Sequence, residues 1–187
     1  MKSYLIIACG VLLLQGCAAA VVGGAAATAS AAHDKRTTGI LVEDQNIEIK
    51  AQSKLRELEK RHQDADIDPV SFNRRVLLIG QIPSAADKAQ ATALVSEIDN
   101  VREVFNEVRI KSTRDVSTAN DAWITTKVKS LLLAEKGVDP TRIKVVTEDG
   151  EVFLMGLVNR EVGDKAALVT RNVDGVKKVV KVFEYID

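Results

Sequence analysis

The sequence predicts an α+β protein made of two tandem modules, each with the order α-β-β-α-β and a small three-stranded sheet packed against two helices. The main observation is an internal repeat, in which Asp44 recurs as Asp121 and Gly80 recurs as Gly156. Further shared positions are Ile47 and Ile124, Lys50 and Lys127, Ser53 and Ser130, and Leu55 and Leu132. A register this long, broken only by one-residue shifts, indicates duplication. Residues that both copies share are expected to be scaffold, so positions that differ are candidates for function.

Each module is predicted to begin with a helix, because its first apolar residues recur at helical spacing. In the first copy, Glu43 and Asp44 precede an apolar stripe that continues to about Arg61. This stripe consists of Ile47, Ala51, Leu55 and Leu58. At about 100° per residue, the matching helix of the second copy has a core face formed by Ile124, Val128, Leu131 and Leu132.

Two short strands follow the helix in each copy. We expect them at 67–72 and 76–79 in the first copy, and at 142–148 and 151–155 in the second. Asp149 and Gly150 separate the second pair, and Asp-Gly between apolar strands is typical of a β-hairpin. Gly80 and Gly156 are expected to end the second strand, where a side chain would block a close backbone approach or a bend.

A second helix and a final strand complete each copy. Ser84 and Asp87 form a capping-box signature at the start of this helix in the first copy. Its expected buried face is Ala91, Leu94, Val95 and Ile98, with the counterparts Ala166, Val169, Thr170 and Val173. Alternating apolar residues predict the closing strands at 101–110 and 176–186.

The composition argues against nucleic-acid binding. The chain has 187 residues, of which 46% are hydrophobic and 28% charged, a range typical of globular domains. Residues 40–111 carry 11 basic and 13 acidic side chains, and residues 119–187 carry 11 of each. Only 4% of the chain is aromatic. Neither copy is a polycation or offers a stacking platform, so we expect no nucleic-acid partner.

The amino terminus predicts a secretion signal and a lipid anchor. Lys2 is followed by an uncharged, mainly apolar run over residues 3–16, as in a signal peptide. Residues 14–17, Leu-Gln-Gly-Cys, resemble the lipobox of bacterial lipoproteins, in which the cysteine is acylated and the signal is cut just before it. This resemblance implies that Cys17 carries fatty acyl chains such as palmitate. Ala18, where such lipoproteins carry Asp for retention at the inner membrane, implies export to the outer membrane.

Two other interpretations of this segment stay open. One is an ordinary signal peptide with a chance cysteine, and the other is a transmembrane helix extended through the small residues 18–32. Cys9 lies within the signal, so a chain that starts at Cys17 has no second thiol and forms no internal disulfide.

The repeated strands carry a resemblance to a known family. Two α-β-β-α-β copies, each with a Val-x-Leu-x-Gly strand, resemble BON domains. These strands are Val76, Leu78 and Gly80 in the first copy, and Val152, Leu154 and Gly156 in the second. The resemblance covers about residues 42–187 and implies phospholipid binding in the bacterial envelope. Together with Cys17, it implies a dual-BON-domain outer-membrane lipoprotein that faces the periplasm.

The first helix of the second copy has an outer face that differs from its counterpart. Trp123, the only tryptophan, stands where the first copy has Asn46. An amphipathic indole suits a membrane interface, and Lys127 one turn on could meet a lipid phosphate. We therefore assign lipid binding to Trp123, Thr126, Lys127, Ser130 and Leu133. The alternative is that Trp123 fills the seam between the modules.

The sequence does not predict an enzyme, a metal site or a cofactor. His33 and His62 are the only histidines, both are expected to be solvated, and neither belongs to a catalytic or metal-ligand motif. Asp64, Asp66 and Asp68 alternate as at the start of a calcium loop, but Arg75 occupies the twelfth position, where such a loop needs glutamate. We expect no small-molecule substrate.

Two functions remain in view. The leading hypothesis is an outer-membrane lipoprotein whose second module binds anionic phospholipid and helps maintain envelope integrity. The alternative is a protein-interaction scaffold or adaptor for an outer-membrane assembly machine. The expected organisation is a signal peptide at 1–16, a lipidated tether at 17–41, modules at 42–111 and 119–187, and a linker at 112–118.

Overall fold

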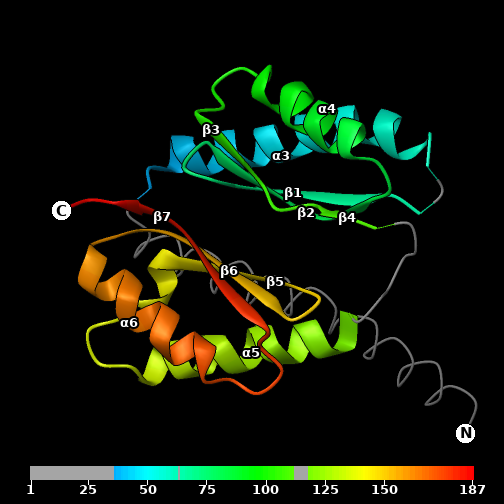
Figure 1. The fold of residues 1–187 in the computed structure, drawn as a ribbon. Coiled ribbons are helices and arrows are strands. Elements are labelled where there is room, and N and C mark those ends of the chain that lie inside the picture. The colour runs from blue at the N-terminus through cyan, green and yellow to red at the C-terminus, as the bar shows by residue number, and fades with distance from the viewer. Residues whose placement is uncertain (1–35, 63, 112–117) are drawn as a thin grey trace, which may run out of the picture. The chain divides into compact units, whose positions relative to one another are not determined.

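Both modules have the predicted order α-β-β-α-β (Figure 1). The structure is a computed structural model that describes residues 36–62, 64–111 and 118–187. These described residues group together as one compact unit. Cys17, the signal peptide and residues 112–117 of the linker lie outside the described residues.

The first module consists of two helices and a mixed sheet. Its elements are α3 (Thr38–Glu59), β1 (Asp66–Phe72), β2 (Arg75–Ile82), α4 (Ala85–Ser96), β3 (Glu103–Asn106) and β4 (Arg109–Ile110). Strand β2 is central, since it pairs antiparallel with β1 and parallel with both β3 and β4. Helix α3 begins at Thr38, within the segment predicted as tether, because the Thr37 hydroxyl caps it by accepting a hydrogen bond from the Ile40 N–H at 3.3 Å.

The second module repeats this arrangement. Its elements are α5 (Thr118–Ala134), the 3-10 turn η2 (Pro140–Arg142), β5 (Ile143–Glu148), β6 (Glu151–Val158), α6 (Arg160–Arg171) and β7 (Lys178–Tyr185). Strand β6 pairs antiparallel with β5 and parallel with β7. The turn η2 was not predicted. The Asp139 side chain caps it by accepting a hydrogen bond from the Thr141 N–H at 3.1 Å.

The final strand of the first module is broken, whereas a single strand was predicted. The Asn106 side chain causes the break, because its Oδ1 accepts a hydrogen bond from the Val108 N–H at 3.1 Å. Its Nδ2 donates to the Lys88 carbonyl and to the Thr92 hydroxyl, both at 2.8 Å. The corresponding residue of the second module is Lys181, and β7 continues without interruption.

Gly80 and Gly156 lie inside β2 and β6, so the prediction that they end these strands is wrong. The predicted close approach is present. A Cβ atom at Gly80 would lie 2.1 Å from the Asp66 carbonyl oxygen, and one at Gly156 would lie 2.5 Å from the Arg142 carbonyl oxygen. Only glycine fits where the neighbouring strand crosses this closely.

Each sheet has its own helices packed on one face. In the first module this core contains residues from α3, β1, β2 and α4, centred on Ile47, Leu55, Val76, Leu78 and Val95. In the second it contains residues from α5, β5, β6 and α6, centred on Ile124, Leu132, Val152, Leu154 and Ala166. Figure 1 shows α5 and α6 side by side on the second sheet.

A third apolar cluster joins the opposite faces of the two sheets and forms the seam between the modules. It consists of Phe72, Leu77, Ile79, Phe153, Met155 and Val182. Leu77 and Phe153, like Ile79 and Met155, are equivalent positions of the repeat. Neither sheet therefore leaves a broad apolar face in water, and the modules stabilise each other.

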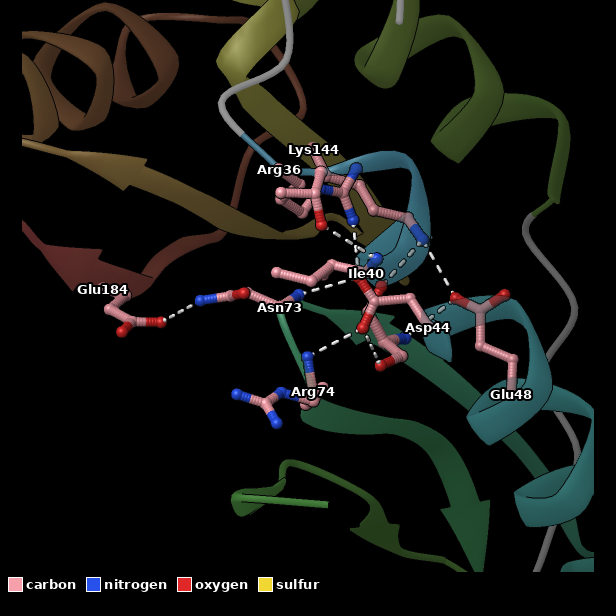
Figure 2. A network of polar contacts seen from close by, with 10 residues as sticks. Arg36, Ile40, Asp44, Glu48, Asn73, Arg74, Lys144 and Glu184 are labelled. Carbon is pink, nitrogen blue, oxygen red and sulfur yellow. Dashed lines mark hydrogen bonds and ion pairs between the residues drawn. The ribbon is translucent and has the colours of Figure 1, made fainter. Parts of the chain in front are cut away.

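Polar contacts between the modules lie beside this seam, and Figure 2 shows one network of them. The Asn73 side chain donates a hydrogen bond to Glu184 at 2.7 Å, and Lys144 forms an ion pair with Glu48 at 3.0 Å. At another point of the seam, Arg109 pairs with Asp149 in the turn between β5 and β6. These cross-module pairs fix the register in which the two sheets pack.

Candidate functional site

Helix α5 is oriented by one buried face. Ile124, Val128 and Leu132 are fully buried, and Leu131 is partly buried against the same core, as the helical projection predicted. The Thr125 hydroxyl lies 2.7 Å from that of Thr147 in β5, which adds a polar contact to the sheet. The opposite side of the helix is thereby presented to solvent.

All five residues assigned to lipid binding lie on this solvent side. Trp123 is 50% exposed and Leu133 is 73% exposed. Thr126, Lys127 and Ser130 lie between them on the helix and are exposed as well. The seam cluster does not include Trp123, so the alternative that Trp123 packs between the modules is wrong. The site thus has two large apolar side chains that the fold leaves largely uncovered.

The two hydroxyl groups of this face donate hydrogen bonds to backbone carbonyls of the same helix. The Thr126 hydroxyl donates to the Ala122 carbonyl at 2.9 Å, and the Ser130 hydroxyl donates to the Thr126 carbonyl at 2.9 Å. Because their donors already have partners, moving these side chains out of water costs less than their polarity suggests. The face is therefore better suited to a partly apolar environment than its composition alone indicates.

Lysines flank the apolar residues on both sides of the helix. Projection places Lys127 on one flank and Lys129 on the other, and both are exposed. Neither forms an ion pair with another residue in the part of the chain that the structure describes. Lys129 was not among the predicted site residues. The repeat could have identified it, because its counterpart in the first copy is the neutral Gln52.

The other candidate residues from the sequence are His62 and the aspartates of residues 64–68, since His33 lies outside the described residues. His62 is partly buried rather than solvated, because its Nε2 lies 2.7 Å from Asp87. Asp66 and Asp68 lie in β1, and no group of three potential ligands within the described ranges is placed to hold a metal ion. Among the helices described, none has the length and apolar character needed to cross a bilayer. The Cys17 acylation and the transmembrane alternative both concern residues that lie outside the described part of the chain.

Comparison with known proteins places both repeats in one family. The BON domain family matches residues 43–112 and 120–187. The chain is 39% identical to outer membrane lipoprotein DolP of Haemophilus influenzae over 188 residues, which cover all of this chain and 97% of that protein. It is 40% identical to the 21 kDa hemolysin of Actinobacillus pleuropneumoniae, over 82% of this chain and 79% of that protein. It is 30% identical to osmotically-inducible protein Y of Escherichia coli, over 61% and 59% of the two chains.

Proposed function

The chain belongs to the BON domain family as a dual-BON-domain outer-membrane lipoprotein, and we propose that its second module binds anionic phospholipid through the outer face of α5. This binding supports the integrity of the envelope from the periplasmic side of the membrane. The observation that carries the proposal is the exposure of Trp123 and Leu133 between two lysines that have no ion-pair partner among the described residues.

The charge of the face favours an anionic surface. Lys127 and Lys129 flank the apolar residues, and each is free to meet a lipid phosphate while its aliphatic stem lies along the interface. Attraction of a basic residue to an anionic membrane is worth about 1 kcal/mol near the surface. Two lysines therefore provide a modest preference for anionic over zwitterionic lipid.

The apolar contribution is also modest. Burying a whole tryptophan removes about 150–250 Å² from water. Because half of Trp123 is exposed in the fold, moving that half into the interface removes about 100 Å², worth about 2.5 kcal/mol at 25 cal/mol per Å². A chain held at the membrane by its acyl groups needs no stronger contact, since the tether keeps the module at a high local concentration. Helix α5 thus supplies lipid preference, and acylated Cys17 supplies attachment.

A charge placed on the face tests this proposal. We expect Trp123→Glu to abolish binding of the unacylated chain, residues 18–187, to phosphatidylglycerol vesicles in a sedimentation assay. Asn46→Glu is the matched control, because Asn46 is the exposed equivalent in the first module, and it should bind normally. Unchanged binding by Trp123→Glu would refute the assignment.

A second candidate function is a protein-interaction scaffold or adaptor for an outer-membrane assembly machine. The same exposed apolar pair on α5 favours it, since a partner protein could also cover Trp123 and Leu133. A photo-crosslinker at position 123 separates the two functions in intact cells. Lipid adducts support phospholipid binding, and specific protein adducts support the adaptor.

The anchor is tested separately. We expect residues 18–187, exported behind a signal that is cut without acylation, to leave the membrane fraction, because the contact made by α5 is too weak to retain the chain at the low lipid concentration of a diluted cell lysate. An exported chain without Cys17 that stays in the membrane fraction would contradict acylation of Cys17 as the attachment.

A further inference from the structure

We propose that the membrane-binding surface of the second module extends from α5 onto α6, with Leu168 as a third apolar contact beside Trp123 and Leu133. This inference rests on the proposed function of α5. It adds a second helix to the surface and defines the orientation in which the module meets the bilayer.

Leu168 is a large apolar residue on the solvent side of α6. Helix α6 buries Gly163, Ala166, Ala167 and Thr170 against the sheet and α5. Leu168 lies on the opposite side and is 56% exposed. Its equivalent in the first module is Ala93, which is also exposed but has only a methyl group. The second copy has thus gained apolar surface on α6, as it has on α5 at Trp123 and Leu133.

Helices α5 and α6 lie side by side on the same sheet (Figure 1), and two close approaches join α5 to α6 and to the turn that follows it. Near the end of α5, a Cβ atom at Gly137 would lie 3.8 Å from the Nζ of Lys165. Near its start, a Cβ atom at Gly175 would lie 3.2 Å from the Cδ1 of Ile124. Leu168 lies between these two points in the chain, and because both helices pack on the same face of the sheet, its exposed side faces away from the sheet as the outer face of α5 does.

The charges around Leu168 do not oppose an anionic surface. The two exposed acidic residues of α6 are both paired, Glu161 with Lys165 at 2.7 Å and Asp164 with Lys181 at 2.9 Å. The contact with Lys165 lowers the pKa of Glu161, and the contacts with Glu161 and Asp164 raise the pKa of Lys165 and Lys181. Arg171, in the last turn, is exposed and forms no ion pair with a described residue. The uncompensated charge of the α5 and α6 surface is therefore positive.

A membrane-binding surface on two helices constrains the orientation of the module on the bilayer more than a surface on one helix does. Trp123 and Leu133 lie along a single helix, about which the module could still roll on the bilayer. Leu168 lies on the neighbouring helix and provides a third point outside that line. Contact at all three points holds the axes of α5 and α6 parallel to the membrane plane.

Nitroxide labels on single cysteines test this orientation. The chain has no cysteine after position 17, so Leu168→Cys, Leu133→Cys and Ala93→Cys each give one labelling site on exposed surface. The acylated full-length protein is reconstituted into vesicles of equimolar phosphatidylglycerol and phosphatidylethanolamine. Accessibility to oxygen and to a water-soluble nickel chelate is then measured at each label.

We expect the labels at 168 and 133 to be shielded from the chelate and the label at 93 to remain accessible. If 168 is as accessible as 93 while 133 is shielded, α6 lies off the membrane and this inference is overturned, although lipid binding by α5 stands. If 168 and 133 are both accessible, the inference and the proposed function both fail.

A binding measurement gives an independent test without labels. We expect Leu168→Glu to weaken binding of residues 18–187 to phosphatidylglycerol vesicles by about tenfold, because apolar contact is lost and a charge is added. Ala93→Glu, the same change at the equivalent exposed position, should leave binding unchanged. Equal affinities of the two variants would overturn the contact at Leu168.

Discussion

The carboxylate of Asp121 in α5 accepts a hydrogen bond from the backbone N–H of Gly150, with Oδ1 lying 2.8 Å from the nitrogen. Its other oxygen accepts from the Asp149 N–H at 2.7 Å. Asp149 and Gly150 both have positive φ angles and form the tight turn between β5 and β6. Asp121 therefore stabilises the turn of the β5–β6 hairpin from within α5. It lies two residues before Trp123, whose side chain is exposed. The first module repeats this contact, in which Asp44 accepts from the N–H groups of Asn73 and Arg74.

Removing the Asp121 carboxylate should destabilise the second module. We expect Asp121→Ala to lower the free energy of unfolding by about 3 kcal/mol, because the buried N–H of Gly150 and the partly buried N–H of Asp149 lose a charged acceptor. Asp121→Asn, which keeps one oxygen acceptor, should cost less. Urea unfolding followed by circular dichroism measures both values, and an alanine variant as stable as the wild type would contradict this role for Asp121.

The seam between the sheets should couple the unfolding of the two modules. Leu77 in the first module is fully buried, so Leu77→Ala is expected to cost about 2–5 kcal/mol. Trp123 lies in the second module, and its fluorescence should report the same loss if the modules unfold together. Ile49→Ala is the control, because Ile49 is exposed. If Leu77→Ala leaves the transition seen by Trp123 unchanged, the seam does not stabilise the second module.

The stability of the first module should depend on the ionisation of Glu59. Burial raises the pKa of Glu59, Asp66 and Asp68 raise it further, and the hydrogen bond from the Ile67 N–H opposes them. Because the folded pKa exceeds the unfolded one, the folded state binds the proton more tightly, and stability falls as pH rises through this range.

Glu59→Gln isolates this effect, since the amide oxygen can still accept the hydrogen bond from Ile67, which is 2.8 Å long in the wild type. We expect the variant to be more stable than the wild type at neutral pH and to lose this advantage below about pH 4, where glutamate is protonated. Thermal unfolding at the two pH values measures the difference. A variant less stable than the wild type at neutral pH would show that the ionised carboxylate is stabilising.

The core of each module was predictable because each helix has a single apolar stripe, and that stripe identifies the face that packs on the sheet. Ile124, Val128 and Leu132 were placed by periodicity alone, and the same projection placed Trp123 outside. The strand break at Asn106 was not predictable. It depends on the hydrogen bond that the Asn106 side chain accepts from the Val108 N–H, and the alternation of apolar and polar residues carries no signal for that bond.

The residues that form the seam were not identified, although the sequence held a signal for them. The runs VLLIG and VFLMG are apolar at every position before the glycine, whereas a strand with one face in water alternates apolar and polar residues. Leu77 and Phe153 thus indicated a second buried face on each sheet. Leu168 was not predicted, because the buried positions of the second helix identify its core face but do not show that the exposed Ala93 of the first copy is replaced by a large apolar residue in the second.

The emission of Trp123 tests the central claim most directly. Trp123 is the only tryptophan in the chain, so intrinsic fluorescence reports on this side chain alone. We expect the emission maximum to shift to shorter wavelength when phosphatidylglycerol vesicles are added to residues 18–187, and to stay unchanged with phosphatidylcholine vesicles. An emission maximum that does not move while the protein sediments with phosphatidylglycerol vesicles would contradict membrane contact through α5.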